Sequence, residues 1–155
     1  MKLQVTTPSP TEIRMTRTFD APKALVIEAM TTPALVMRWL GNSRSPITSA
    51  EIDLRPGGRY RYVFRLPDGK EFALSGVHEK ITPDRIVFTQ VMEGMPGESK
   101  NTTTFVEQNG VTTMTVTLRF PDQQTRDMVL ATGMTDGAGE SYDNLASVLS
   151  GAAAQ

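Results

Sequence analysis

The chain contains no cysteine and only one histidine. The first absence excludes disulfides, thiolate metal sites, iron–sulfur clusters and cysteine nucleophiles, so nothing in the sequence demands an oxidising compartment. The second excludes a zinc or iron site built from several histidines. We therefore expect neither a metal nor a cofactor.

Long apolar runs are missing as well. The first ten residues contain no apolar stretch of signal-peptide length, and no segment approaches the length of a membrane span. An excess of charge of one sign is also absent, because 16 basic and 17 acidic residues give a formal net charge of −1. Such a balance provides no field to hold a polyanion. We expect a cytoplasmic protein that neither binds nucleic acid nor inserts into a membrane.

The length fits one domain. A chain of 155 residues can bury most of the surface that its unfolded form exposes, and the sequence shows no repeat or second domain. We expect a single domain over residues 1–155, with its core at about 13–149 and loose ends at 1–11 and 151–155. As an assembly we expect a monomer or a homodimer.

Segment 53–66 has the clearest pattern of strand, bend and strand. Pro56 cannot donate to a strand ladder and Gly57-Gly58 accepts positive φ, so the chain bends or bulges there. Apolar and basic residues then alternate. The apolar face carries Tyr60, Tyr62, Phe64 and Leu66, and the other carries Arg59, Arg61 and Arg65. We interpret the arginine face as solvated and partly paired with Glu71 and Glu79, not as an anion site.

The other elements follow from similar local signals. We expect a strand at 13–19, two short helices at 20–31 and 32–40, and further strands at 70–81, 86–92, 102–107 and 111–120. Asn109-Gly110 indicates a two-residue hairpin turn, which sets Phe105 opposite Met114. Asp122 caps a long helix that reaches about Leu149. This order predicts an α+β fold in which a curved antiparallel sheet wraps around one helix.

The final helix has one apolar stripe. Its members recur at steps of three and four residues: they are Met128, Ala131, Met134, Ala138, Tyr142, Leu145 and Leu149. Gly133, Gly137 and Gly139 interrupt it, and each weakens a helix by about 1 kcal/mol relative to alanine. Glycines at these positions indicate close approach or free room beside the helix.

Several motifs agree in order and spacing with a known family. They are Asp53-Leu54-Arg55-Pro56-Gly57-Gly58-Arg59-Tyr60, the Pro67-Asp68-Gly69 turn, the stretch from Gly76 to Thr89, and the stretch from Gly133 through Tyr142 to Leu145. Over roughly residues 13–149 the chain resembles the activator of Hsp90 ATPase homolog 1 (AHSA1)-like branch of the START-like superfamily, also called SRPBCC or Bet v 1-like. The resemblance implies a helix-grip fold, with about six to seven strands curved around a long C-terminal helix and two short helices after the first strand.

The resemblance also implies a deep apolar hollow between sheet and helix, which holds lipid-like or aromatic ligands in many relatives. Many members carry a tryptophan where this chain has Ala138. The smaller side chain is expected to enlarge the hollow or to change its contents. Function transfers weakly within the superfamily, which includes ligand carriers, polyketide cyclases, hormone receptors and co-chaperone domains.

The candidate ligand-binding residues are those expected on the inner faces of the sheet and helices. They are Trp39, Tyr60, Tyr62, Phe64, Phe72, Leu74, His78, Phe88, Phe105, Met114, Val116, Met128, Met134, Ala138 and Tyr142. Core packing is the competing role for each of them. An inward tyrosine is more telling, because a buried hydroxyl needs water or a polar ligand group as its partner. Trp39 is expected either at the mouth of the hollow or as an anchor of its helix.

His78 is the one candidate for acid–base chemistry. Its expected register places it on the same face as Phe72 and Leu74, beside any bound ligand. No second catalytic residue can be named, and a hydrogen-bonded structural histidine is the competing interpretation. We identify no catalytic constellation.

Three functions are compatible with this pattern. The first is binding of a small, largely apolar molecule, lipid-like or aromatic, between the sheet and the final helix. The second, from the resemblance alone, is partnership with an Hsp90-type chaperone. The third is a cyclase- or hydrolase-like enzyme that acts on a hydrophobic substrate through His78 with a tyrosine or glutamate.

Overall fold

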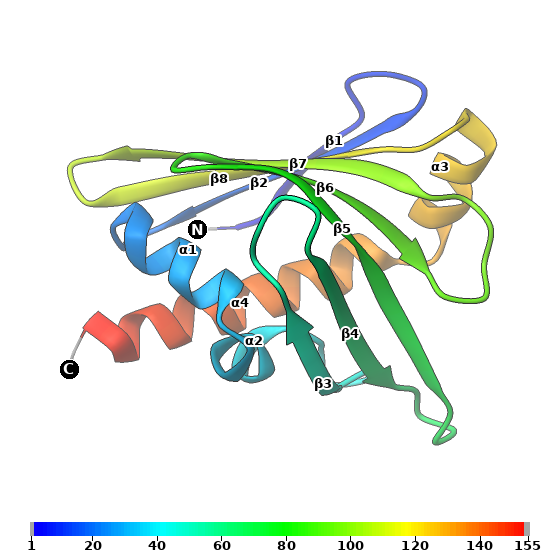
Figure 1. Ribbon diagram of the computed structural model, residues 1–155, viewed down its shortest axis with the longest axis horizontal. Helices are drawn as coiled ribbons and strands as arrows, with labels where there is room; N and C mark the ends of the chain where they lie inside the picture. Colours follow the sequence, from blue (N-terminus) through cyan, green and yellow to red (C-terminus); the bar gives the residue numbers. More distant parts are fainter. Residues whose placement is uncertain (1, 154–155) are drawn as a thin grey trace.

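A curved antiparallel sheet forms one layer of the protein, and helices cover its concave face (Figure 1). The computed structural model describes residues 2–153. The eight strands are β1 (Gln4–Thr6), β2 (Glu12–Phe19), β3 (Ile47–Ile52), β4 (Arg59–Arg65), β5 (Glu71–Thr82), β6 (Arg85–Met92), β7 (Ser99–Gln108) and β8 (Val111–Arg119). They lie in the order β1-β2-β8-β7-β6-β5-β4-β3, and each pair of neighbours is antiparallel. The predicted α+β helix-grip architecture is confirmed, with one more strand than the upper expectation.

The additional strand lies in the segment that we predicted to be a loose end. Val5 of β1 is the register partner of Met15 of β2, so this part of 1–11 belongs to the sheet. The segment is polar and short, which is typical of an edge strand and explains why periodicity did not reveal it. At the other end, the helix continues through 151–153, and the remaining residues of the predicted tail lie outside the described range.

Two short helices follow β2, as predicted. They are α1 (Lys23–Thr31) and α2 (Pro33–Trp39), and Pro33 occupies the first turn of α2 as the sequence indicates. The chain ends in α3 (Gln123–Ala131) and α4 (Met134–Ala153). The single helix predicted from 122 to 149 is therefore wrong. Gly133 has φ +77, a left-handed conformation that ends α3 and lets α4 begin in a new direction.

The β7–β8 hairpin forms in the predicted register. Asn109 and Gly110 both have positive φ, which is the geometry of a two-residue type I′ turn. Phe105 is opposite Met114, and Thr103 is opposite Val116. The same inward face continues through β2, where Met15 is the partner of Val116.

The interior is filled most completely beneath β2, β7 and β8. The largest side chains with almost no exposure there are Ile13, Phe19, Phe105 and Met114, joined by Leu145 of α4. Fully burying a side chain of this size contributes about 1.5–3 kcal/mol. This half of the sheet is the core that holds the fold together, and the half made by β3–β6 differs from it.

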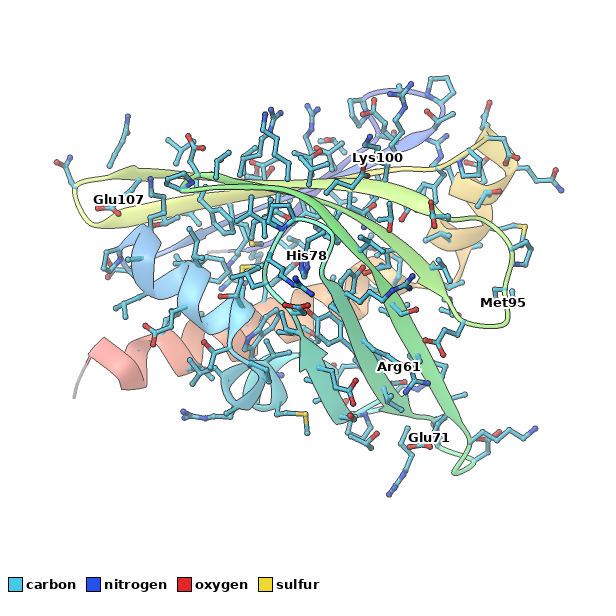
Figure 2. All side chains as sticks on the ribbon, in the orientation of Figure 1. Arg61, Glu71, His78, Met95, Lys100 and Glu107 are labelled. Carbon is cyan, nitrogen blue, oxygen red and sulfur yellow. The ribbon has the colours of Figure 1, made fainter. Side chains whose placement is uncertain are left out.

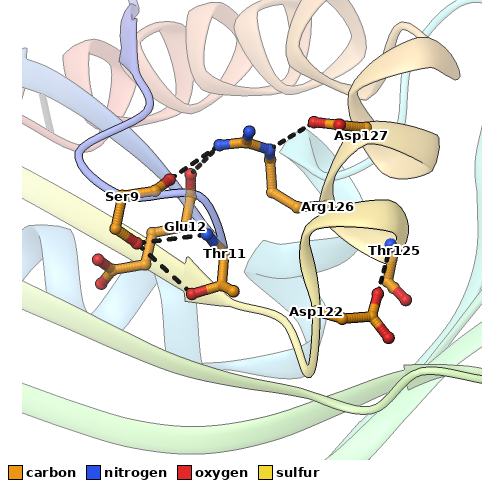
Figure 3. Close-up of polar contacts among 7 residues, drawn as sticks. All are labelled: Ser9, Thr11, Glu12, Asp122, Thr125, Arg126 and Asp127. Carbon is orange, nitrogen blue, oxygen red and sulfur yellow. Dashed lines mark hydrogen bonds and ion pairs between the residues drawn. The ribbon is translucent and has the colours of Figure 1, made fainter.

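Arg126 fastens α3 to the start of β2 (Figure 3). Its Nη1 donates to the main-chain oxygens of Ser9 at 2.9 Å and Glu12 at 3.3 Å. Its Nε donates to Asp127 at 2.8 Å. Asp122 caps the helix as predicted, because its carboxylate accepts from the Thr125 amide at 2.7 Å, and this bond lowers the pKa of Asp122. Among residues 2–153, no helix is both long and apolar enough to cross a membrane.

Candidate functional site

Two half-buried tyrosines, one from the sheet and one from the last helix, pack against the core. Tyr62 is on the inner face of β4, and Tyr142 is on the side of α4 that packs against the core. Burial raises the pKa of Tyr142 to about 12, and burial together with the nearby Tyr142 raises the pKa of Tyr62. Among residues 2–153, the tyrosine hydroxyl that forms hydrogen bonds is that of Tyr60. The hydroxyls of Tyr62 and Tyr142 therefore have no protein partner, yet they are not closed off from solvent.

Three apolar residues share this partly buried state. Phe88 comes from β6, and Met134 and Ala138 come from the first turns of α4. All three pack against the core and remain half-buried, as do the two tyrosines. We call these five residues, Tyr62, Phe88, Met134, Ala138 and Tyr142, the inner patch. Their partial exposure contrasts with the complete burial beneath β2, β7 and β8.

Three further candidates lie in the well-filled core. Phe105 is 2% exposed, Met114 is 0% exposed and Val116 is 5% exposed. They face inward as predicted, and their surroundings are those of packed core residues. The structure thus places them on the same sheet face as the inner patch but in its closed half.

The remaining apolar candidates lie elsewhere. Phe64 and Phe72 stack on each other with ring centroids 4.9 Å apart near the β4–β5 turn. Leu74 is half-buried opposite Tyr62. Met128 is 54% exposed on α3, because the break at Gly133 removes it from the stripe that continues through α4.

Trp39 of α2 holds three helices together through one hydrogen bond and one aromatic contact. Its indole Nε1 donates to the main-chain oxygen of Ala29 at 2.9 Å, which joins α2 to α1. Its ring stacks on Tyr142 of α4 with the centroids 6.0 Å apart. With 5% exposure, Trp39 supports one side of the inner patch from below the surface.

His78 faces the interior of the sheet–helix layer (Figure 2). One ring nitrogen, Nδ1, lies 3.1 Å from the main-chain oxygen of Asp53, and the ring lies 5.4 Å from that of Tyr60. Tyr60 is buried too, and its hydroxyl donates to the Thr89 main-chain oxygen at 2.7 Å. Both residues thus have main-chain partners, which is typical of structural roles.

Two buried polar residues on the inner face were not predicted from the sequence. Asn101 of β7 is 1% exposed, and Arg17 of β2 is 5% exposed. Neither the side-chain oxygen nor the side-chain nitrogen of Asn101 has a hydrogen-bond partner, and Arg17 Nε also lacks one, among residues 2–153. Strict alternation along β2 and β7 was the signal that could have placed them inward.

Two hollows lie outside the sheet–helix interior. One, of about 470 Å³, is lined by Glu51, Ile52, Asp53, Arg55, Gly57 and Arg59. The other, of about 430 Å³, lies on the outer face and includes Arg61, Glu71 and Glu93 in its lining. Both are rich in charged groups, so they do not suit an apolar molecule. We predicted an apolar hollow between the sheet and the last helix, and neither of these two hollows lies there.

Among residues 2–153, one arginine of β4 forms an ion pair, and its partner is not one of the carboxylates that we predicted. Arg61 Nε donates to Glu93 at 2.9 Å, and Arg65 is the register partner of Glu71. Glu79 instead lies 3.5 Å from the ammonium group of Lys100. The expected pairing of Glu79 with an arginine is therefore wrong, and Glu79 lies where the register of β5 against β6 shifts between His78 and Lys80.

The tyrosines give a testable pH dependence. All three, Tyr60, Tyr62 and Tyr142, have a pKa raised mainly by burial. An unfolded tyrosine ionises near pH 10, so stability from these neutral hydroxyls is complete below about pH 10 and is lost as the pH rises toward 12. We expect absorbance at 295 nm to show almost no tyrosinate at pH 10.5 in the folded protein, and most of it in urea. A folded protein that ionises a tyrosine near pH 10 contradicts this assignment.

Comparison with solved structures places the fold among bacterial proteins. A crystal structure from Rhodobacter sphaeroides has a TM-score of 0.91 and 26% identity, and the match covers 97% of this chain and 99% of that one. A crystal structure from Nitrosomonas europaea has a TM-score of 0.85 and 21% identity over 96% of this chain and 100% of that one. A crystal structure from Mycobacterium smegmatis has a TM-score of 0.82 and 24% identity over 94% and 97%. No protein with a curated description matches the chain.

A match by sequence covers most of the domain. It runs over residues 20–150, from the end of β2 to the last turns of α4, and so includes every element that forms the inner patch. The solved structures above share the fold of this matched region. The chain belongs to the family described as Activator of Hsp90 ATPase homolog 1-like protein.

Proposed function

We propose that the protein binds a small, largely apolar molecule at the inner patch, between β4–β6 and α4. The observation that carries this proposal is the pair of unpartnered hydroxyls of Tyr62 and Tyr142 among half-buried apolar side chains. Hydroxyls that have no protein partner and remain open to solvent are free to bind water or a polar group of a ligand. The expected ligand therefore has an apolar body and a polar group.

The unequal filling of the interior supports the same location. Beneath β2, β7 and β8 the side chains are packed together and almost fully buried, whereas the residues of the inner patch remain partly exposed to solvent. Ala138 contributes only a methyl group to that patch. Apolar sites with a few convergent polar groups are typical of small-molecule binding sites.

Methionine methyl groups offer a direct test with naphthalene as the probe. We expect the ¹³C-methyl resonance of Met134 to shift on titration, because this residue belongs to the inner patch. Met128, which is 54% exposed on α3, serves as the internal control and is expected not to shift. Shifts of all methionines alike, or none at Met134, would overturn the proposal.

A filled variant makes the test specific. Ala138→Trp places an indole in the inner patch, so we expect naphthalene binding to weaken at least tenfold. Asn144→Trp adds the same ring to the exposed side of α4 and is expected to bind as the unsubstituted protein does. Equal binding by both variants would place the probe elsewhere on the molecule.

The family description gives one specific reason to test a chaperone partner. We expect a chaperone role to be secondary to ligand binding. A cytoplasmic location remains a prediction from the sequence. Stimulation of a bacterial Hsp90 ATPase by the purified protein, and equal stimulation by Ala138→Trp, would show a partner function that does not use the inner patch.

A further inference from the structure

Asn101 presents an unsatisfied amide to the interior. It is 1% exposed, and neither its Oδ1 nor its Nδ2 has a hydrogen-bond partner among residues 2–153. Leaving buried polar groups unpaired is costly, and native structures contain few such groups. Both halves of one amide are unpaired here, so a single complementary group could satisfy both.

The strand pattern shows which way this amide points. Along β7, Ser99, Asn101 and Thr103 are buried, whereas the Lys100 side chain between them is 61% exposed on the outer face (Figure 2). Asn101 therefore faces the helices. Its partners in register are Phe88 of β6 and Leu118 of β8, and neither side chain can form a hydrogen bond to it.

Phe88 connects Asn101 with the inner patch. In register, Phe88 lies between Asn101 of β7 and His78 of β5. Its ring is half-buried and makes an edge contact with Tyr60, with the centroids 5.8 Å apart. Asn101 is thus the neighbour, in register, of a residue of the inner patch, and a ligand that contacts both must reach past the Phe88 ring.

We infer that Asn101 is the recognition residue of this site, and that the ligand is an uncharged apolar molecule whose polar group presents a donor beside an acceptor. This inference rests on the proposed function. A lactam or a primary amide has such a group, and its N–H and C=O pair with Asn101 Oδ1 and Nδ2 in a planar ring of two hydrogen bonds. A carboxylate fits less well, because it would bring two acceptors to one acceptor and one donor.

The charges of the inner face agree with an uncharged ligand. Arg17, a buried cation of β2, is in register with Met114, four positions away from Leu118, the neighbour of Asn101. Arg17 Nη1 is paired with Asp143, although its Nε has no partner among residues 2–153. Burying an unpaired carboxylate beside Phe88 and Leu118 would carry a large desolvation cost. The inner face thus selects for a neutral group at Asn101.

A matched pair of probes tests the inference. 2-Quinolinone carries the lactam N–H beside its C=O, and N-methyl-2-quinolinone lacks that donor. We expect the lactam to bind at least tenfold more tightly, measured by calorimetry, and to shift the Asn101 side-chain NH₂ resonances. Naphthalene, which has neither group, reports on the apolar part of the site alone.

Two variants separate recognition from packing. Asn101→Leu removes both polar atoms at similar volume, so we expect it to lose the preference for the lactam while it still binds naphthalene. Thr103→Val, at the next inward position of β7, is the control and is expected to retain the preference. If Asn101→Leu does not fold, the NH₂ shifts of the unsubstituted protein still decide the question.

The outcomes are distinct. If neither naphthalene nor 2-quinolinone binds, the proposed function fails and the inference fails with it. If naphthalene binds but the two quinolinones bind equally, the proposed function stands and the inference is wrong. A crystal structure of the complex with one ordered water on the Asn101 amide and the lactam elsewhere would also overturn the inference.

Discussion

Replacement of Gly76 by alanine is expected to lower the free energy of unfolding by about 3 kcal/mol, because the new methyl group would overlap the main chain of β6. An ideal Cβ at this position lies 1.8 Å from the Thr89 main-chain oxygen and 2.9 Å from the Tyr60 hydroxyl oxygen. No rotamer change can relieve contact with a backbone atom. The strands would have to separate where the sheet supports the inner patch.

The reason lies in how Tyr60 crosses the sheet. Tyr60 and Gly76 are register partners, and the ring passes over the glycine to reach the next strand. Its hydroxyl donates to the Thr89 main-chain oxygen at 2.7 Å, and the Val77 amide donates to Thr89 Oγ1 at 3.1 Å. These two side-chain bonds bridge a stretch where β5 and β6 have no direct register pair. Gly76 is therefore needed for close approach rather than for an unusual φ.

Urea unfolding measures this prediction, with Gly139→Ala as the control. Gly139 lies within α4, and its added Cβ would meet only the Leu3 side chain at 4.0 Å, so we expect a gain of about 0.5–1 kcal/mol. Tyr60→Phe should not rescue Gly76→Ala, because the main-chain contact remains. A Gly76→Ala protein within about 0.5 kcal/mol of the unsubstituted one would show that β5 and β6 lie farther apart than we describe.

Local signals in the sequence were sufficient for much of the fold. Asn109-Gly110 determines the type of the hairpin turn, and this turn type fixes the register of β7 against β8. The pairing of Phe105 with Met114 could therefore be predicted. Asp122 was recognisable as a cap because capping depends on the next three residues only. Alternation also placed Tyr60 and Tyr62 on the inner face of β4.

Other features depend on tertiary context. The apolar stripe from Met128 to Leu149 continues across Gly133 in the sequence, but the left-handed residue there rotates α3 away and exposes Met128. β1 carries little pattern of its own, and its pairing with β2 decides its conformation. Neither outcome could be read from spacing alone.

The polar part of the candidate site was the least predictable. A buried Asn101 or Arg17 looks like a surface residue in a threonine-rich or arginine-rich strand, since its type favours exposure. Whether such a residue is paired depends on groups far along the chain. Arg17 finds Asp143 in α4, whereas Asn101 finds no partner among residues 2–153. The first therefore contributes to stability and the second is free to contribute to recognition.

The ion pair between Arg17 and Asp143 joins the sheet to α4. Arg17 Nη1 lies 2.5 Å from Asp143 Oδ1, with the two side chains 6% and 69% exposed, respectively. The guanidinium carbon also lies 5.4 Å from the ring centroid of Phe19. The arginine is thus the buried member of the pair, and the aspartate is the hydrated one.

This asymmetry predicts unequal effects of removing each partner. Asp143→Ala leaves a buried guanidinium without its carboxylate, so we expect the free energy of unfolding to fall by about 2–3 kcal/mol. This is less than the cost of breaking a fully buried pair, because the aspartate is exposed. Arg17→Met removes the charge and keeps the apolar stem, so we expect a change within about 1 kcal/mol. In the Arg17→Met background, Asp143→Ala should cost almost nothing.

Urea unfolding of the two single variants and the double variant completes the cycle, and Glu93→Ala is the control. Glu93 accepts two hydrogen bonds from Arg61, at 2.9 and 3.0 Å, but both side chains are substantially exposed. An exposed pair contributes less than about 1 kcal/mol even with good geometry. If Asp143→Ala costs no more than Glu93→Ala, the guanidinium of Arg17 reaches water, and the inner face beneath β2 is more open than its burial indicates. If Arg17→Met costs as much as Asp143→Ala, the pair itself, rather than the stranded charge, holds α4 to the sheet.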